Sequence, residues 1–522
     1  MQVNTLSRKL PLSLNPYQAY GALTNNGNVE NTALLETAEA GTHNHQKSVI
    51  MLSAALKVTA LDKSVELISL NSNGDALIKT LKSNAVLSDN FQVTASERKL
   101  SLTLLPIPES NDESVRLIAT TSVTVLQVIR DLLKTNSDSG NETSLLIGAF
   151  SYEVVEQYEK LPSIDKSQED YCFYVADQLI IQQRDSQSAK IVVKGFADNA
   201  DNTVRLGVEL DKIYQTLTNT SSIKPLVFKT SEANPELSVN VSDSDYCQFV
   251  DKAKERIIEG DIFQVVLART FSITCNNAYQ AYGKLRISNP SPYMYYINFG
   301  GKELFGASPE SALKVNRKRE VFLYPIAGTR KRARDSETGK VDHEQDARVE
   351  FELIADEKEG AEHMMLVDLA RNDLAKVVKP ESREITQLKR IVKYSHVQHM
   401  VSEVKGILQA NIDSLVAYRA CANMGTLTGA PKIKAMEIIR EQESSGRGYY
   451  GGAVCTLNAN DEFDSAIIIR SAVVEDGIAK ISAGAGVVHD SEPHLEALET
   501  LNKAKAVIDA CRTNGPKSEL LS

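Results

Sequence analysis

Short runs of alternating apolar and polar residues constrain the fold of this chain more than any other feature. ALKVTAL, VELISL and AKIVVKGF occur in the first half, and IFQVVLARTFSIT and PYMYYINFG in the second. A period of two is typical of strands that bury one face, as antiparallel sheets do. Helical patterns lie between these runs. The sequence therefore predicts an α/β protein in the broad sense (α+β), with an antiparallel sheet and interspersed helices.

Charge and composition restrict the partners of the chain. It has 522 residues and a formal net charge of −10, which disfavours nucleic acid and anionic membrane as partners. No stretch reaches the ~18 consecutive apolar residues of a membrane span. The six cysteines are widely separated and show no metal-type spacing with histidine, so they are expected to be reduced. We expect a cytoplasmic protein.

A polar, turn-rich segment at 217–244 has the composition of a linker. We place a domain boundary there, with an N-terminal domain at 1–240 and a C-terminal domain at 241–522. The second domain is predicted to open with a helix that starts at Asp243, runs through Ile257 and Ile258 and ends at Gly260. Later strands are predicted in REVFLYPIAG, SAIIIRSAVVE and AKISAGAGVV. No P-loop, nucleophile elbow or HExxH zinc motif occurs.

Two predicted helices carry paired carboxylates. In DEKEGAEHMMLVDLARND, Glu359 and Glu362 are three residues apart and share a face. In HLEALETLNKAKAVIDA, Glu496, Glu499 and Lys503 form one stripe. If the two faces met, their oxygens would suit a hard cation such as Mg²⁺. The alternative is two solvated helix faces with local ion pairs.

Two strand segments hold candidate anion-binding groups. Arg470 is predicted on the apolar face of the strand SAIIIRSAVVE, where a charge is costly unless it meets an anion. That anion is either a ligand or a structural ion-pair partner. Gly484, Ala485 and Gly486 follow a predicted strand, and small residues let a ligand carboxylate approach backbone amides. The alternative for these three residues is a tight turn.

Five further strings each place one polar side chain beside Gly, Pro or a strand end: DIFQVVLAR, FGASPES, YPIAGTRKR, KYSHVQH and NMGTLTGAPKIKAM. Together with EHMMLVDLARNDLA, NPSPYM and GAGVV, and in this order, they resemble the chorismate-utilising enzyme family over residues 30–510. The resemblance implies a large antiparallel two-sheet β-sandwich flanked by helices, into which the N-terminal segment packs.

Within the family, the chain is most similar to enzymes that make anthranilate, the first committed step of tryptophan biosynthesis. The resemblance implies that ammonia adds at C2 of chorismate with loss of the C4 hydroxyl, and that pyruvate is then eliminated. Glu310 is expected to be the general acid for the departing hydroxyl, which requires a pKa raised by burial. His399 is expected to assist the departure of a leaving group. Gln264 and Thr426 complete the expected catalytic set.

Two positions separate this chain from its sibling enzymes. Isochorismate and salicylate synthases carry a lysine base that activates water where this chain has Gln264, and ammonia needs no such base. Aminodeoxychorismate synthases carry a nucleophilic lysine in PIKGT, where this chain has Ala327. Two alternatives stay open, a 2-amino-2-deoxyisochorismate synthase that aminates without eliminating pyruvate, and a catalytically inactive regulatory homologue.

The resemblance also implies a cofactor and a substrate site. Mg²⁺ would be held by Glu362 and Glu499, with Glu359 and Glu496 in support through water. The residues expected to bind chorismate, by its two carboxylates or around its ring, are Gly328, Thr329, Tyr450, Arg470, Gly484, Ala485, Gly486 and Lys503.

Two partners follow from the same resemblance. No GxCxGxQ-type motif surrounds any cysteine, so a separate glutamine amidotransferase subunit is expected to supply ammonia in a heterotetramer. L-Tryptophan is expected to bind as an allosteric inhibitor. The residues implied for its site are Glu36, Thr37, Lys47, Ser291, Pro292, Tyr293 and Met294. The chain departs from the family there, because LLES reads LLET and GAVGYF reads GAVCTL, with Cys455 and Thr456.

Overall fold

The computed structural model describes residues 2–11, 14–38, 45–107, 110–166, 168–184, 187–196, 200–219, 235–335, 338–394 and 397–512. Most of the predicted linker, at 220–234, lies outside the described residues, as do two residues of the KYSHVQH string.

The described strands form three antiparallel sets. The first set, in order of pairing, is β1 (Asn4–Lys9), β9 (Ser188–Gly195), β8 (Tyr171–Gln183), β3 (His45–Leu61), β4 (Ser64–Ser69), β6 (Lys99–Leu104) and β5 (Phe91–Ala95). The second set starts on β8 and contains β7 (Leu145–Phe150), β20 (Ala453–Asn458), β21 (Phe463–Ile467), β14 (Ser311–Val315), β15 (Glu320–Leu323), β18 (Val397–Ile407), β16 (Ile326–Lys331) and β17 (Glu384–Lys393). The third set starts on β3 and contains β2 (Thr32–Ala38), β12 (Tyr293–Asn298), β13 (Lys302–Ser308), β22 (Ser471–Glu475), β23 (Ile478–Val487), β11 (Gln264–Thr274), β10 (Ser238–Val239) and β19 (Gly429–Ala430).

The second and third sets pack against each other through their buried faces. Ile147 and Val454 of the second set share one apolar cluster with Tyr295 and Leu304 of the third. Because side chains alternate along a strand, the opposite faces of these strands turn outward, where helices cover them. The predicted fold class, a mixed helix and antiparallel-sheet protein, is confirmed.

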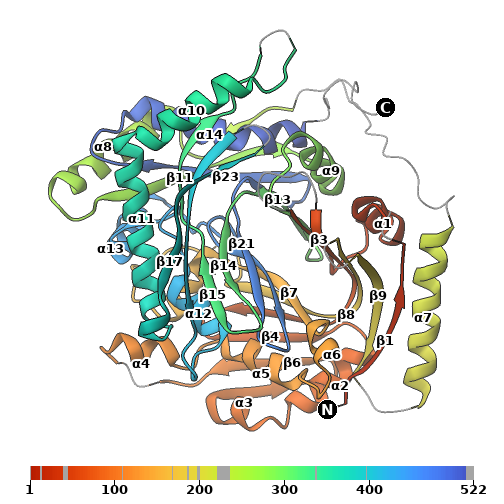
Figure 1. Cartoon of the computed structure of the whole chain (residues 1–522). Helices are drawn as coiled ribbons and strands as arrows, with labels where there is room; N and C mark the ends of the chain where they lie inside the picture. Colours follow the sequence, from red (N-terminus) through yellow and green to blue (C-terminus); the bar gives the residue numbers. More distant parts are fainter. Residues whose placement is uncertain are drawn as a thin grey trace.

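The helices surround the sheets (Figure 1). They are α1 (Pro16–Leu23), α2 (Ser72–Leu81), α3 (Ala85–Asn90), α4 (Glu113–Ile118), α5 (Thr124–Leu132), α6 (Asp138–Glu142), α7 (Ala200–Thr218), α8 (Asp243–Ile258), α9 (Ala278–Ser288), α10 (His343–Ala355), α11 (Glu357–Ala375), α12 (Ser414–Cys421), α13 (Lys432–Gln442) and α14 (Pro493–Cys511), with the 3₁₀ turns η1 (Tyr152–Gln157) and η3 (Pro380–Ser382). None of the described helices is long and apolar enough to cross a membrane.

Three predicted helices that bear on the site form as the sequence indicates. Helix α8 spans Asp243–Ile258, and the Ser242 hydroxyl caps it by accepting a hydrogen bond from the Asp245 amide. The two segments with paired carboxylates become α11 and α14. The prediction of one continuous strand in REVFLYPIAG is wrong. This segment forms two strands, β15 and β16, which are separated around Pro325 because proline has no amide proton to donate to a sheet.

Residues from both sides of the predicted boundary near 240 pair in the same sheets. Strand β2 pairs with β12, with Thr37 opposite Tyr293, and β7 pairs with β20, with Phe150 opposite Ala453. The N-terminal segment is therefore built into both facing sets. The division into domains at residue 240 remains a prediction.

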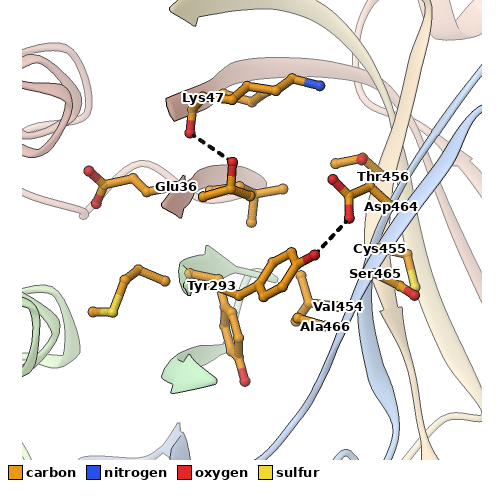
Figure 2. A pocket seen from close by; sticks show the side chains of 14 residues that line it. Glu36, Lys47, Tyr293, Val454, Cys455, Thr456, Asp464, Ser465 and Ala466 are labelled. Carbon is orange, nitrogen blue, oxygen red and sulfur yellow. Dashed lines mark hydrogen bonds between the residues drawn. The ribbon is translucent and has the colours of Figure 1, made fainter. Parts of the chain in front are cut away.

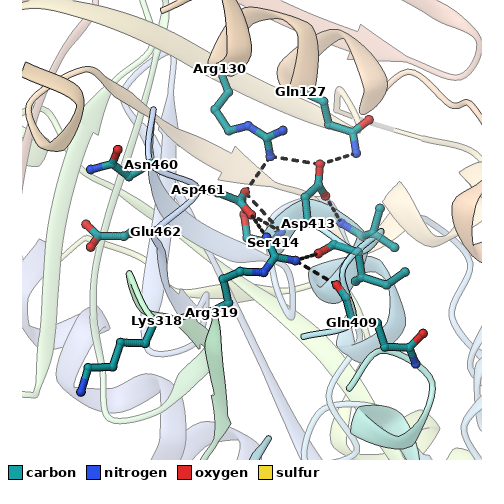
Figure 3. Close-up of polar contacts among 12 residues, drawn as sticks. Gln127, Arg130, Lys318, Arg319, Gln409, Asp413, Ser414, Asn460, Asp461 and Glu462 are labelled. Atoms are coloured by element: carbon teal, nitrogen blue, oxygen red, sulfur yellow. Dashed lines mark hydrogen bonds and ion pairs between the residues drawn. The ribbon is translucent and has the colours of Figure 1, made fainter. Parts of the chain in front are cut away.

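A buried polar cluster also joins the two halves of the chain (Figure 3). Arg130 of α5 contacts Asp461, in the turn between β20 and β21, at 2.6 Å, and Asp413, the N-cap of α12, at 3.0 Å. Ser414 donates its hydroxyl to Asp461 over 2.7 Å. From the far side, Arg319 donates to the backbone carbonyl of Gln409 over 2.9 Å. The cluster fixes α5 and α12 against the ends of the second set of strands.

Candidate active site

Helices α11 and α14 bring the predicted metal-binding carboxylates close enough to affect one another. Burial raises the pKa of Glu362, and the negative charges of Glu359 and Glu499 raise it further. Burial also raises the pKa of Glu496, to which the charge of Glu499 adds. Carboxylates from two helices thus face one another, and their mutual repulsion would be relieved by a cation between them.

Two of the four carboxylates already have a cationic partner. Arg330 lies 2.6 Å from Glu359, and Lys503 lies 2.7 Å from Glu499. Glu362 forms no ion pair within the described part of the chain. Across those described ranges, no group of three or more His, Cys, Asp or Glu side chains is close enough together to hold a metal ion. The donor chemistry fits Mg²⁺, and ligation would require these side chains to draw together.

Strands β11 and β23 form one wall of the site. Gly484 pairs with Ala268 and Gly486 with Val266. The strand predicted in AKISAGAGVV is therefore confirmed as β23 with these glycines inside it, and their placement after the end of a strand is wrong. A side chain at Gly484 would come within 2.9 Å of the Tyr450 hydroxyl, so glycine lets the tyrosine approach the backbone. Ala485, between the two glycines, is buried and points to the opposite face of the sheet.

Lys503 reaches the same wall from α14. Its ammonium donates a hydrogen bond to the Gly484 carbonyl over 2.9 Å, in addition to its contact with Glu499. The predicted metal helix and the predicted substrate strand are therefore joined by one lysine. The Tyr450 hydroxyl also lies close to Gly484, and burial raises the pKa of this hydroxyl, which stays protonated.

Arg470 lies where the chain crosses from the second set of strands to the third. The predicted continuous strand SAIIIRSAVVE is wrong: β21 ends at Ile467, β22 begins at Ser471, and Arg470 has a left-handed backbone with φ of 50°. Its guanidinium forms no hydrogen bond or ion pair with the described residues. Burial lowers its pKa, partly offset by the nearby Glu310 carboxyl. A half-buried arginine that pairs with no carboxylate of the described residues is suited to a ligand carboxylate.

Glu310 is buried between β13 and β14, with 7% of its surface exposed. Burial raises its pKa to about 8, although a hydrogen bond from Thr426 and the charges of Arg470 and Lys503 act in the opposite direction. Thr426 donates to Glu310 over 3.1 Å. The carboxyl is therefore protonated at neutral pH and able to donate a proton, as the sequence predicts for a general acid.

His399 and Thr329 come from neighbouring strands. Thr329 of β16 pairs with His399 of β18, and the threonine hydroxyl lies 2.8 Å from the His399 Nδ1 atom. Burial lowers the pKa of His399 to about 3, with a contribution from Arg470, so the imidazole is neutral. Its Nε2 atom is buried and has no partner among the described residues. Next to Thr329, Gly328 adopts φ of 82°, and a side chain there would approach Glu359 to 3.2 Å.

Gln264 stands at the start of β11, opposite Ala430 of β19. Its side-chain nitrogen lies 2.7 Å from the point where a Gly486 side chain would begin. Any larger residue at position 486 would collide with the Gln264 side chain, so glycine is needed there. This brings Gln264 onto the same wall as Gly484 and Tyr450.

Arg447 is a site residue that the motifs did not identify. Its guanidinium donates hydrogen bonds to the backbone carbonyls of Leu427 and Val266, over 2.7 Å each. It also forms an ion pair with Glu443 at 2.5 Å. The guanidinium carbon lies 5.8 Å from the centre of the Tyr450 ring. One buried arginine thus joins the Thr426 loop, β11 and Tyr450. Its only sequence signal is a charge between two glycines in GRGYYGG.

Glu153 of η1 supports the same loop from the N-terminal half. Its carboxyl oxygens accept hydrogen bonds from the amides of Arg447 and Gly448 over 2.7 and 2.9 Å. Burial raises its pKa to about 7, against these hydrogen bonds. Residues before the predicted boundary therefore help to shape the site.

A separate pocket contains most of the residues predicted to bind tryptophan (Figure 2). Its empty volume is about 430 Å³, including solvent at its mouth, and Thr37, Lys47, Tyr293 and Met294 line it together with Cys455 and Thr456. Tyr293 donates a hydrogen bond to Asp464 over 3.3 Å.

Three of the predicted residues take other positions around this pocket. Glu36 lines it but directs its carboxylate away (Figure 2), where it pairs with Arg286 and accepts from Tyr282. Ser291 and Pro292 are not among the lining residues, although the Pro292 carbonyl accepts from Ala38 at the end of β2. Asp464, which also lines the pocket, was not predicted.

Comparison with known proteins places these features in a family. Residues 95–509 match the chorismate binding enzyme family. The anthranilate synthase component 1 of Escherichia coli is 41% identical over 92% of this chain and 92% of its own length, and that of Vibrio cholerae is 39% identical over 97% of this chain and 96% of its own.

Two solved structures share the fold. The anthranilate synthase component I of Streptococcus pneumoniae superposes with a TM-score of 0.69 and 26% identity, covering 89% of this chain and 92% of that one. The menaquinone-specific isochorismate synthase of Escherichia coli has a TM-score of 0.67 at 16% identity, covering 99% of this chain and 95% of that one, and shows the fold alone. The chain belongs to the chorismate binding enzyme family, among relatives named anthranilate synthase component 1.

Proposed function

We propose that this chain converts chorismate and ammonia to anthranilate, pyruvate and water. The observation that carries the proposal is the proximity of a neutral, buried Glu310 to Arg470, a half-buried guanidinium that has no ion pair with the described residues. A proton donor beside an anion receptor suits a dianionic substrate that loses a hydroxyl group. The names of the relatives support the same reaction.

The side chains have separate tasks in this reaction. Arg470 binds one substrate carboxylate, and Lys503 with the backbone at Gly484 holds the other. Glu310 gives its proton to the C4 hydroxyl as it leaves as water while ammonia bonds to C2. The Nε2 atom of the neutral His399 has no hydrogen-bond partner in the described part of the chain, which fits a proton acceptor in the elimination that releases pyruvate and makes the ring aromatic.

We propose Mg²⁺ as the cofactor, held by Glu362 and Glu499 with Glu359 and Glu496 in support. The raised pKa of Glu362 on α11, to which the charge of Glu499 on α14 contributes, supports this. When bound, the ion would stabilise negative charge on a substrate carboxylate. The chain's part is to hold Glu499 in place through Lys503, which also contacts the substrate strand.

Ammonia is proposed to come from a separate glutamine amidotransferase subunit. The cysteines support this, since five of the six are buried and none has the motif of a glutaminase nucleophile. Thiols that stay reduced also favour a cytoplasmic protein. The purified chain with ammonium and Mg²⁺ should therefore form anthranilate, seen by its fluorescence, but should not use glutamine.

The same assay distinguishes the alternatives. A product that carries an amine but keeps the enolpyruvyl group would indicate a 2-amino-2-deoxyisochorismate synthase. A chain that consumes no chorismate would indicate an inactive homologue. Glutamine-dependent anthranilate formation by the chain alone would contradict the proposed division between subunits.

L-Tryptophan is proposed to inhibit the enzyme from the pocket in Figure 2. Lys47 and Asp464 offer a cation and an anion on its walls, which suit the two charges of an amino acid. A short stretch of chain links the pocket to the proposed active site. Val454 of β20 lines the pocket and follows Tyr450 by only four residues. Calorimetry should detect binding of L-tryptophan, and its absence at millimolar ligand would refute this regulation.

A further inference from the structure

The edge of β11 that faces away from β23 is interrupted in its strand pairing. On this edge β19 pairs with β11 only as far as Val265, and β10 pairs with it only from Phe271 onward. None of the described strands pairs there with Val266 and Ala268. On their other side, these two residues pair with the two glycines of the active-site wall in β23. The stretch of β11 behind that wall therefore needs another support.

A buried ion pair supplies this support. Arg447 donates a hydrogen bond to the Val266 carbonyl over 2.7 Å, and Glu443 accepts one from the Ala268 amide over 2.8 Å. Only 3% of the Arg447 side chain and 9% of the Glu443 side chain are exposed. The two side chains thus offer a donor and an acceptor where a neighbouring strand would offer its amide and its carbonyl.

The same guanidinium holds the turn that carries Thr426. Its Nη1 atom donates a hydrogen bond to the carbonyl of Leu427, the next residue, over 2.7 Å. Within the turn, the Leu427 amide donates to the Met424 carbonyl over 2.9 Å. The Thr426 hydroxyl, which this turn presents, donates to Glu310 over 3.1 Å. One turn of backbone therefore lies between Arg447 and the proposed general acid.

The contacts of Arg447 require the shape of a guanidinium. Two of its nitrogens face the Glu443 carboxylate, at 2.8 and 2.5 Å, while the remaining donors reach two backbone carbonyls. The Tyr152 ring lies 4.8 Å from the guanidinium carbon. A planar fork can satisfy these directions at once, whereas a lysine ammonium is a compact charge on a flexible stem. Loss of the fork with retention of the charge should therefore release the turn.

We infer that Arg447, supported by Glu443, is a positioning residue that sets Thr426 against the general acid Glu310. The inference rests on the proposed function, because it assigns a support to the acid of that reaction. Loss of this support should weaken the hydrogen bond from Thr426 to Glu310. The groups proposed to bind the substrate carboxylates, Arg470 and Lys503, stay unaltered.

The test replaces the fork and keeps the charge. Arg447→Lys is compared with Arg440→Lys, the matched control. The Arg440 side chain is also 3% exposed and pairs with Glu156 at 2.5 Å, but it donates to the Pro162 carbonyl and to no part of the Thr426 turn. Both kcat and KM are measured from the consumption of chorismate over a range of pH, with saturating ammonia and Mg²⁺.

Arg447→Lys should lower kcat about tenfold or more and raise the KM for chorismate less than about threefold. Its descending pH limb should move to higher pH, as in Thr426→Val, because Glu310 loses a hydrogen bond that lowers its pKa. Arg440→Lys should change none of these quantities. An unmoved limb in an Arg447→Lys enzyme that still binds chorismate would overturn the inference.

A double variant shows whether Arg447 acts through Thr426. If it does, kcat of Arg447→Lys/Thr426→Val should lie within about twofold of the slower single variant. Losses that multiply would refute this route of action. If Arg447→Lys does not fold, Glu443→Gln replaces it, since it keeps an oxygen for the Ala268 amide, and it should move the limb in the same direction.

A measurement without turnover tests the same contact. From about pH 8 to about pH 9, the unfolding free energy of Arg447→Lys should fall relative to the unaltered chain, because Glu310 stays protonated to higher pH. This fall should vanish in the Glu310→Gln background. An equal fall in both backgrounds would come from the new lysine and would contradict the inference. The other charged or titratable groups around Glu310 are the same in every variant: Arg470, Lys503, Tyr394, Tyr324 and Asp373.

The outcomes separate the positioning role from the reaction itself. If the unaltered chain consumes no chorismate, the proposed function fails and the unfolding measurements decide on Arg447. If the unaltered chain is active and Arg447→Lys behaves like Arg440→Lys, only the positioning role is refuted.

Discussion

Thr426 donates a hydrogen bond to Glu310 over 3.1 Å, and it does so to a carboxyl whose pKa burial has raised to about 8. The hydrogen bond fixes the orientation of the Glu310 side chain. The acidic proton is then placed on the second carboxyl oxygen, which is available to the substrate. The pair therefore combines a fixed geometry with a proton available at neutral pH.

The first prediction concerns the pH dependence of kcat. At saturating ammonia and chorismate, kcat should fall as the pH rises above about 8, because Glu310 loses the proton that the leaving hydroxyl needs. Glu310→Gln should lower kcat by about 10²–10⁴-fold and remove this descending limb. Thr426→Val should move the limb to higher pH, because it removes a hydrogen bond that lowers the pKa.

Glu310→Gln should also change the free energy of unfolding, and the size of this change should depend on pH. The pKa of Glu310 is about 8 in the folded chain and 4.5 for a free carboxyl, so its stabilising contribution is complete below pH 4.5 and is lost as the pH rises through 8. Unfolding by urea should therefore show that Glu310→Gln gains stability relative to the unaltered chain as the pH rises from about 5 to about 8. If the difference in unfolding free energy between Glu310→Gln and the unaltered chain stays constant over this range, the pKa of Glu310 is not raised in the folded chain.

The second prediction concerns Mg²⁺. Glu362→Gln should raise the Mg²⁺ concentration for half-maximal activity by on the order of tenfold or more, because it removes a proposed ligand. The matched control is Glu357→Gln, an exposed glutamate in the first turn of the same helix. Direct titration of Mg²⁺ by calorimetry checks the effect without relying on turnover. Equal Mg²⁺ requirements for the two variants would remove Glu362 from the metal site.

The sequence predicted the helices of the site better than its strands. Capping and periodicity gave α8, α11 and α14, and with them the stripes that carry Glu362 and Glu499. A helical stripe is a local property, so its face follows from spacing. What the stripe faces depends on tertiary packing, which is why Arg330 as a partner of Glu359 was not predicted.

The errors in the strands have a common cause. Alternation in SAIIIRSAVVE continues through Arg470, but the chain leaves one set of strands and joins another at that residue. A pattern of period two reports burial on one face and not which neighbour a strand pairs with. Likewise, glycine at 484 and 486 is typical of a turn, while the structure uses it within β23 to admit Tyr450 and Gln264.

The third prediction concerns tryptophan binding. Lys47→Met should weaken the binding of L-tryptophan about tenfold, since it removes the cation proposed to meet the ligand carboxylate. Lys79→Met, on the exposed side of α2, is the control and should leave binding unchanged. Calorimetry measures both dissociation constants. If the two variants have equal dissociation constants, either Lys47 does not contact L-tryptophan or the ligand does not bind in the pocket of Figure 2.

The fourth prediction concerns the polar cluster in Figure 3. Only 9% of the Arg130 side chain is exposed, and it lies between Asp413 and Asp461. Removing it leaves Asp413 with no ion-pair partner in the described residues and Asp461 with Arg319 alone, at 4.0 Å. Burial already raises the pKa of Asp461, and Arg130 is the group that most opposes this. Arg130→Met should therefore destabilise the fold by about 3–5 kcal/mol, as loss of one partner of a buried ion pair does.

Arg98→Met is the control for this cluster. Its contact with Asp75 is 3.5 Å long and half exposed, and its loss should cost about 0–1 kcal/mol. Urea unfolding measures both variants. Arg130→Met/Asp461→Asn should recover part of the lost stability, because it removes one of the two neighbouring carboxylate charges that Arg130 neutralised. If the single variant is as stable as the control, α5 and α12 are held together by apolar packing around Leu126 and Tyr418, and the polar cluster contributes little.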